Sequence, residues 1–202
     1  MIITFFNQRI DPLIPKYQKK VMDHFNVNIE QIIPQNWGTH AGEVDKYLKE
    51  TKRDWEYMVL FDVDCIPLNK DIVNEGIEWS MNNLGLFSVA QYASHIPDSL
   101  IYASPAFLCF SRKTYEFLDS PKFIQTHRSD CGGELTYEAM KKGYKIELMY
   151  PSHVETPKWK LGNKGMFGLG TTYDNKIYHH FEARQNRVES FVKKCKDVID
   201  ES

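Results

Sequence analysis

A short apolar segment that ends in two aspartates constrains the fold of this chain more than any other feature. Residues 57–67 read Tyr-Met-Val-Leu-Phe-Asp-Val-Asp-Cys-Ile-Pro. The apolar run at 58–61 is typical of a strand buried on both faces of a parallel sheet. Asp62 and Asp64 follow it directly, where open α/β sheets bind ligands. Since residues i and i+2 of an extended chain point the same way, both carboxylates are expected to reach one divalent cation, whose usual companion is a diphosphate.

The first half of the chain alternates strand and helix patterns. Strands are expected at residues 2–6, 28–33, 58–61 and 85–90. Apolar residues at helical spacing predict helices between them, at residues 15–25, 39–50 and 71–83. Thr39 is expected to cap the second of these helices. This alternation predicts an α/β fold with a mostly parallel central sheet and crossover helices.

The second half is less regular. Strands are expected at residues 105–111, 145–150 and 177–181, and helices at 112–118, 134–142 and 182–199. Residues 153–175 contain four glycines and show no clear pattern, so we expect an irregular segment and a candidate lid. No internal repeat or linker divides the 202 residues, which predicts a single domain.

The composition argues against several classes of partner. A formal net charge of -2 leaves no basic excess for nucleic acid or an anionic membrane. No stretch is long and apolar enough for a membrane span, and the N-terminus lacks the basic region and cleavage site of a signal peptide. The four cysteines lie far apart and show no C-x-x-C spacing. We therefore expect reduced thiols and a cytoplasmic protein.

Residues 60–68, Leu-Phe-Asp-Val-Asp-Cys-Ile-Pro-Leu, resemble the D-x-D segment of the GT-A fold glycosyltransferases. Three other parts agree with that family in order and spacing. The opening strand at 4–7 resembles the nucleotide-binding first strand, and residues 134–146, with Asp130 before them, resemble the acidic acceptor-side motif. Residues 178–181, Tyr-His-His-Phe, resemble a late histidine motif that completes the metal site in many members. The chain is short for the fold, which suggests a compact microbial or viral form.

The resemblance, which covers about residues 1–181, implies a single GT-A (Rossmann-like) domain over residues 1–202. Its parts would be a nucleotide-sugar-binding half at 1–90, an irregular acceptor and catalytic half at 91–181, and a C-terminal helix at 182–199. The implied activity is transfer of a hexose from a nucleotide diphosphate sugar to a hydroxyl of a glycan, glycoprotein or lipid-linked acceptor. Uridine diphosphate is the commonest carrier for this fold, so a UDP-sugar is the expected donor.

The implied metal is Mn²⁺ or Mg²⁺, held by Asp62 and Asp64 with help from His179 or His180. Adjacent residues of a strand face opposite sides, so only one of the two histidines can join the aspartates. The match to the family motif favours His179. Carboxylates suit both cations, and an imidazole ligand favours Mn²⁺.

Asp130 and Glu134 are the candidate catalytic residues, because the acceptor hydroxyl must lose a proton as it attacks. Asp130 is preferred as the base, with Glu134 binding acceptor hydroxyls, although the roles could be exchanged. Leu135 follows Glu134, whereas many inverting members have an adjacent Glu-Asp pair. The competing interpretation is structural, since both acids could serve a helix N-terminus.

The remaining candidates are contacts to the donor, and each could instead serve local capping or packing. They lie at the end of the first strand, around the next helix, at the aspartate pair and in the glycine-rich segment: Thr4, Phe6, Asn7, Gln8, Trp37, His40, Val63 and Lys164. Trp37 is a candidate to stack on a base, and Lys164 to meet a phosphate. Four further aromatics are candidate sugar-stacking surfaces: Tyr92, Tyr102, Trp159 and Phe167.

Two other functions fit parts of the pattern. A haloacid-dehalogenase-like phosphatase also places D-x-D at a strand end, but here Cys65-Ile66-Pro67 follows, and no later strand ends in a second acidic pair. A non-catalytic module that binds a nucleotide sugar or glycan is the other alternative, and the presence of both aspartates with a late histidine argues against it.

Overall fold

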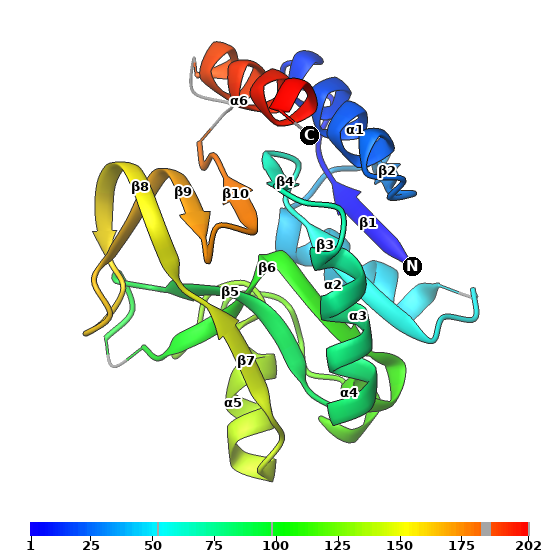
Figure 1. The fold of residues 1–202 in the computed structure, drawn as a ribbon. Helices are drawn as coiled ribbons and strands as arrows, with labels where there is room; N and C mark the ends of the chain where they lie inside the picture. The colour runs from blue at the N-terminus through cyan, green and yellow to red at the C-terminus, as the bar shows by residue number, and fades with distance from the viewer. Residues whose placement is uncertain (52, 98, 183–186, 202) are drawn as a thin grey trace.

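The protein is described by a computed structural model that covers residues 1–51, 53–97, 99–182 and 187–201. The described residues form a central sheet in the order β2-β1-β3-β6-β5-β7 (Figure 1). Its strands are β1 (Ile2–Phe5), β2 (Glu30–Ile32), β3 (Tyr57–Phe61), β5 (Leu86–Tyr92), β6 (Ile101–Ser111) and β7 (Ile146–Met149). The pairs β1–β2, β1–β3 and β5–β7 are parallel, and β6 is antiparallel to both of its neighbours. The expected mostly parallel sheet is confirmed.

Strand β3 has a neighbour on each side and is covered on both faces. Its residues from Met58 to Phe61 are at most 2% exposed, which explains why the segment is apolar without alternation. Its partners are β1 on one side and β6 on the other. The strand expected at 105–111 begins earlier, at Ile101, and runs antiparallel. The alternating pattern did not predict that this strand lies between β3 and β5.

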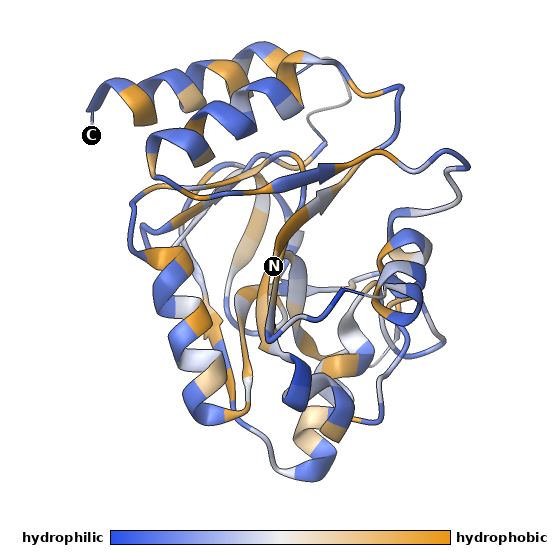
Figure 2. Cartoon of the chain, turned by 90° about the vertical axis from the view of Figure 1, so that its right-hand side faces the viewer, coloured by the Kyte–Doolittle hydropathy of each residue, from blue (hydrophilic) through white to orange (hydrophobic). Residues whose placement is uncertain are grey.

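The helices lie outside the strands and show alternating hydrophilic and hydrophobic stretches (Figure 2). They are α1 (Leu13–His24), α2 (His40–Glu50), α3 (Ile72–Asn83), α4 (Arg112–Phe117), α5 (Gly133–Lys142) and α6 (Val188–Glu201). The hydroxyl of Thr39 accepts a hydrogen bond from the backbone of Gly42, which confirms the expected cap of α2. The part of the expected last helix at residues 183–186 lies outside the described residues. Within the described chain, no helix combines the length and the apolar character needed to cross a membrane.

A second, antiparallel sheet has the order β4-β10-β9-β8. Its strands are β4 (Cys65–Pro67), β8 (Pro151–Lys160), β9 (Met166–Tyr173) and β10 (Ile177–His179). The expectation of an irregular segment at 153–175 is therefore wrong, because most of it forms the β8–β9 hairpin (Figure 1).

Two sequence features hid this hairpin. Strand β8 is largely exposed and rich in polar residues, so it lacks the apolar alternation of a half-buried strand. The glycines also have a role other than flexibility. A Cβ added at Gly168 would lie 2.2 Å from the carbonyl oxygen of Thr156 on the paired strand. Glycine at this position permits a close approach of two strands.

A cluster of buried side chains joins the two sheets to the helices α1 and α6, which pack against each other (Figure 1). Residues of this cluster come from the β1 end, α1, β4, β10 and α6: Phe6, Ile14, Val21, Val63, Ile66, Tyr178, Phe191, Cys195 and Val198. The short turn that carries the two aspartates is part of this cluster through Val63. Packing of α1 and α6 therefore supports the turn from one side.

Candidate active site

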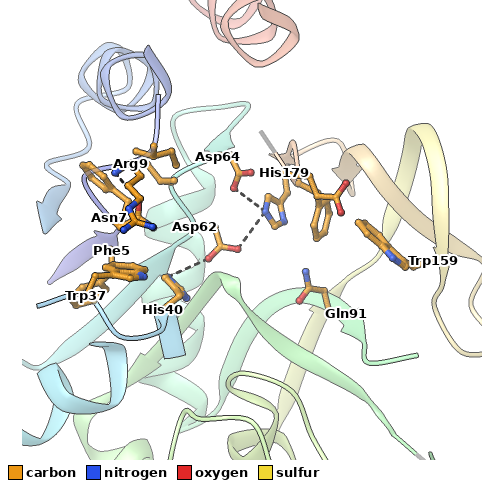
Figure 3. Close-up of a pocket in the computed structure, with 15 residues that line it drawn as sticks. Phe5, Asn7, Arg9, Trp37, His40, Asp62, Asp64, Gln91, Trp159 and His179 are labelled. Atoms are coloured by element: carbon orange, nitrogen blue, oxygen red, sulfur yellow. Dashed lines mark hydrogen bonds and ion pairs between the residues drawn. The ribbon is translucent and has the colours of Figure 1, made fainter. Parts of the chain in front are cut away.

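The carboxyl ends of the parallel strands β1 and β3 lie at the same edge of the central sheet, and a cleft of about 630 Å³ opens there. The end of β1 contributes Phe5 and Phe6, and Asp62 and Asp64 follow β3. The second sheet forms the opposite wall through His179 and Trp159 (Figure 3). Open α/β sheets typically bind ligands at this edge, and the cleft lies where the sequence predicts the site.

Asp62 and Asp64 lie on a tight turn between β3 and β4, and this differs from the extended geometry expected from their spacing. The turn is closed by a hydrogen bond of 3.0 Å from the backbone of Cys65 to the carbonyl of Asp62. Val63, between the aspartates, is 8% exposed and packs into the cluster below. Burial of this one apolar side chain anchors the turn, while the carboxylates on either side of it line the cleft.

Two buried groups hold this turn in place. The side-chain amide of Gln18 on α1 donates to the carbonyls of Asp62, at 2.7 Å, and Cys65, at 3.0 Å. The backbone N–H of His180 donates to the carbonyl of Asp64 at 2.9 Å. The sequence reading missed Gln18. Its signal was a polar residue at a core position of an amphipathic helix, since it lies at helical spacing from Ile14 and Val21.

Asp62, Asp64 and His179 form the one group of potential metal ligands found in the described chain. One ligand atom of each lies within 4.8 Å of the others. The Nε2 atom of His179 is 3.4 Å from Asp62 Oδ2 and 3.2 Å from Asp64 Oδ1. Ligand atoms around one hexacoordinate Mg²⁺-sized ion lie about 3 Å apart. The donor set therefore fits a divalent cation, and its imidazole favours Mn²⁺ over Mg²⁺.

The two adjacent histidines point to different surroundings. The imidazole of His180 makes hydrogen bonds to the hydroxyls of Tyr178, at 2.8 Å, and Ser190 on α6, at 3.1 Å. Burial lowers the pKa of His180, although the nearby Asp64 acts in the opposite direction. Its side chain thus links the end of β10 to the C-terminal helix. Of the two histidines, the structure brings only His179 to the aspartates.

The candidate donor contacts divide into two groups. The structure places five of them on the cleft wall: Phe6, Asn7, Trp37, His40 and Val63. The Nε2 atom of His40 lies 3.5 Å from Asp62 Oδ1, so α2 also reaches the acidic turn. Arg9 and Gln91 line the same cleft and were missed (Figure 3). Arg9 lies in a turn directly after β1. A basic residue so close to the predicted nucleotide-binding strand was the sequence signal that could have identified it.

Three other candidates are not among the described residues that line the cleft. Thr4 lies within β1 and is fully buried. Gln8 is an exposed turn residue. Lys164 is in the turn of the β8–β9 hairpin, with its ammonium group 5.9 Å from the ring centre of Tyr150.

A smaller cavity of about 250 Å³ adjoins the cleft and shares Gln91, Trp159 and Phe181 with it. Asp130 lines this cavity, together with the aromatic candidates Tyr92, Tyr102, Trp159 and Phe167. Burial, followed by the charges of Asp62 and Asp130, raises the pKa of the Cys131 thiol. Asp130 is thus joined to the cleft only through the three residues that line both spaces.

Glu134, in the first turn of α5, is engaged by its neighbours. Its carboxylate accepts hydrogen bonds from the guanidinium of Arg128 and the hydroxyls of Thr126 and Ser129, and its side chain is 12% exposed. The Arg128 guanidinium, helped by these hydroxyls and opposed by burial, lowers the pKa of Glu134 to about 2. A carboxylate held in this way is a poor proton acceptor. The geometry favours the structural interpretation for Glu134.

Replacing Glu134 with glutamine is expected to destabilise the protein by about 2 kcal/mol at neutral pH, because the charge-assisted hydrogen bonds from three side chains are weakened. The folded-state pKa lies below the unfolded value of about 4.3. The stabilisation is therefore complete above the unfolded pKa and is lost as the pH falls towards about 2. Denaturant unfolding of both proteins between pH 7 and pH 2.5 checks this, and a difference that does not shrink in acid would contradict it.

Comparison with known proteins identifies the fold. The sequence matches no family model and no curated protein. Among solved structures, it is similar to the mannosyltransferase PcManGT from Pyrobaculum calidifontis in complex with GDP-Man and Mn²⁺. The TM-score is 0.51 at 11% identity, over 73% of this chain and 53% of that chain. The chain has the GT-A fold.

A second GT-A structure gives the same result over more of the chain. It is a mutant of the Drosophila β-1,4-galactosyltransferase 7 in complex with manganese, UDP-Gal and xylobiose. The TM-score is 0.50 at 11% identity, and the match covers 92% of this chain and 73% of that chain. Both neighbours are nucleotide-sugar transferases, so the resemblance of the sequence to this fold is confirmed.

Proposed function

We propose that the protein is a metal-dependent glycosyltransferase. It moves a hexose from a nucleotide diphosphate sugar, expected to be a UDP-sugar, to a hydroxyl of a glycan, glycoprotein or lipid-linked acceptor. The observation that carries this proposal is the cluster of Asp62, Asp64 and His179 at the sheet edge, within a cleft large enough for a small ligand. The GT-A fold adds support, because both structural neighbours hold a nucleotide sugar with manganese.

The cluster would hold the metal through one carboxylate oxygen of each aspartate and the Nε2 atom of His179. When bound, a divalent cation supplies Lewis-acid neutralisation of the charge that develops on a departing diphosphate. The chain adds a second positive group, since Arg9 lies on the wall near Asn7 (Figure 3). A guanidinium is suited to bind phosphate oxygens with two parallel hydrogen bonds.

The side of the cleft that carries Asn7 also suits a nucleoside (Figure 3). The rings of Trp37 and His40 lie 6.5 Å apart between centroids, and Phe5 approaches His40 at the same distance. All three residues line the cleft, so an aromatic wall faces the space beside the proposed phosphate site (Figure 3). A planar base can stack on such a wall at little cost in desolvation.

The acceptor would enter from the adjoining cavity. Its aromatic lining offers flat apolar faces to the C–H groups of a sugar ring, while Asp130 and Gln91 offer polar contacts to its hydroxyls. In this arrangement the carboxylate of Asp130 accepts the proton of the attacking hydroxyl. Gln91 and Trp159 line both spaces, so donor and acceptor would meet where the cleft and the cavity join.

A thermal-shift screen of nucleotide sugars, with and without Mn²⁺, tests the donor site directly. A ligand at about 100 times its dissociation constant stabilises a protein by roughly 2.7 kcal/mol. For a chain of this size that corresponds to a rise of about 5–10 °C in the melting temperature. We expect such a rise for one nucleotide diphosphate sugar in the presence of Mn²⁺ and a much smaller one without it.

Product analysis with the selected donor and a panel of hydroxyl acceptors then separates the three functions. Sugar transfer, or slow donor hydrolysis that depends on Mn²⁺, supports a glycosyltransferase. Binding without turnover would favour the non-catalytic module, and rapid hydrolysis of simple phosphomonoesters would favour the phosphatase.

Replacing Arg9 with alanine is expected to raise the dissociation constant of the donor about tenfold, because one charge-assisted contact to phosphate is lost from an exposed side chain. Calorimetry with the donor and Mn²⁺ measures the change. The matched control is Arg53→Ala, which removes an exposed arginine that pairs with Glu30 and is not among the residues lining the cleft. Equal donor affinity in the Arg9 variant and the unmodified protein would place the phosphates elsewhere.

A further inference from the structure

The imidazole of His179 lacks the support that usually orients a metal ligand. Its Nε2 atom faces the two aspartates, and its side chain is only 3% exposed. The other ring nitrogen, Nδ1, is buried and has no hydrogen-bond partner in the described chain. A histidine that binds a metal nearly always donates a hydrogen bond from its second nitrogen, and this bond sets the angle of the ring. In this site some other contact must set that angle.

The ring of Phe181 lies against the His179 imidazole. Their centroids are 3.6 Å apart, the shortest ring–ring distance among the described residues, and their planes are inclined by 31°. Strand β10 ends at His179, and Phe181 has a left-handed backbone with a φ of 53°. Phenylalanine is rarely found in this conformation. The chain therefore leaves strand geometry at the residue whose ring contacts the His179 imidazole.

Phe181 is itself held by the β8–β9 hairpin. Its ring centroid lies 5.5 Å from that of Trp159 and 5.6 Å from that of Phe167. The next residue, Glu182, also has a left-handed backbone. Both of its carboxylate oxygens accept hydrogen bonds from the ammonium nitrogen of Lys158, each at 2.7 Å. The strained turn therefore contacts β8 in two ways: Glu182 pairs with Lys158, and the ring of Phe181 packs on Trp159.

We propose that Phe181 is the positioning residue of His179. It holds the imidazole at the angle that directs Nε2 to the metal, in place of the missing hydrogen bond at Nδ1. The inference rests on the metal role of the cluster under the proposed function. It goes beyond that role because an apolar residue that is not itself a ligand, Phe181, then controls the affinity for the metal.

Mn²⁺ binding without nucleotide tests this directly, by calorimetry or by the loss of the free Mn²⁺ signal in electron paramagnetic resonance. Loss of an outer residue that orients a ligand usually weakens metal binding 10- to 100-fold, so Phe181→Leu is expected to raise the dissociation constant of Mn²⁺ by about this factor. The variant Phe181→Tyr keeps the ring and is expected to stay within about threefold of the unmodified protein.

The matched control is Phe167→Leu. It removes a ring that packs on Trp159 and Phe181, but among the described residues the Phe167 ring does not pair with the His179 ring. Its Mn²⁺ affinity is expected to change less than about twofold. Equal losses in Phe167→Leu and Phe181→Leu would overturn the proposal, because general loosening of the aromatic packing would then explain both.

Two more measurements distinguish a loss of the Phe181 contact from unfolding of the variant and from failure of the proposed function. The melting temperature of each metal-free variant shows whether it is folded, and Phe181→Met provides a second ring-free variant if leucine is not tolerated. Unchanged Mn²⁺ affinity in a folded ring-free variant, with binding still lost in Asp64→Ala, would overturn the role of Phe181 and leave the glycosyltransferase intact. Absence of Mn²⁺ binding in the unmodified protein, alone and with nucleotide, would overturn both.

Discussion

Replacing Asp64 with alanine is expected to lower sugar transfer by at least about 1,000-fold, which corresponds to about 4 kcal/mol of transition-state stabilisation. The side chain contributes one of the two carboxylates of the cluster, at 3.2 Å from His179. Without it, the remaining aspartate and imidazole would hold a divalent cation weakly, and the charge of the departing diphosphate would be left without its main partner. Transfer and Mn²⁺-dependent donor hydrolysis should be lost together.

Steady-state assays over a range of Mn²⁺ concentrations measure this effect and show whether excess metal restores any activity. The matched control is Asp54→Ala, because Asp54 is a fully exposed aspartate that pairs with Arg112 and is not among the residues lining the cleft. The melting temperature of each variant excludes unfolding as the cause. Full activity in a folded Asp64→Ala protein would remove the proposed function.

Replacing Asp130 with asparagine is expected to lower kcat by a factor of about 100 to 10,000, the usual contribution of a general base. An amide has nearly the shape of a carboxylate but cannot accept the proton of the attacking hydroxyl. The donor site lies in the larger cleft, and Asp130 lines the adjoining cavity. The affinities for donor and Mn²⁺ should therefore change less than about threefold.

Comparison with Glu134→Gln decides which acid is the base. Glu134 is bound by Arg128, Thr126 and Ser129, so its glutamine variant should lose stability but keep kcat within about fivefold where it is folded. Rates are best compared at a temperature well below the transition of the less stable protein. If Glu134→Gln loses kcat and Asp130→Asn retains it, the roles of the two acids are exchanged.

Patterns that are local in the sequence predicted most of the fold. The apolar run before Asp62 has no alternation because β3 is covered on both faces, so it was recognisable as a central strand. The Thr39 cap and the amphipathic helices follow equally local rules. The β8–β9 hairpin was missed because β8 is an exposed edge strand whose polar residues carry no periodic signal. An edge strand of this kind is specified by its partner, β9.

The candidate site shows the same division between local and long-range information. Residue type and spacing were enough to predict the aspartate pair at the strand end, the late histidine pair and the acid before α5 as site residues. Of the two histidines, His179 lies beside the aspartates because β10 pairs with β4, which sets His179 opposite Cys65. Gln18 was invisible as a site residue because it acts on backbone carbonyls 44 and 47 residues away.

The sequence by itself determined that this chain has an α/β fold with carboxylates at the end of a buried strand, because periodicity and strand-end chemistry are encoded within a few neighbouring residues. Only the tertiary structure decided which side chains surround them. It brought His179 and Phe181 across from a second sheet, and it placed Glu134 with Arg128 outside the cleft wall. Contacts of this kind depend on strand register and helix packing between distant segments, and no local pattern specifies them.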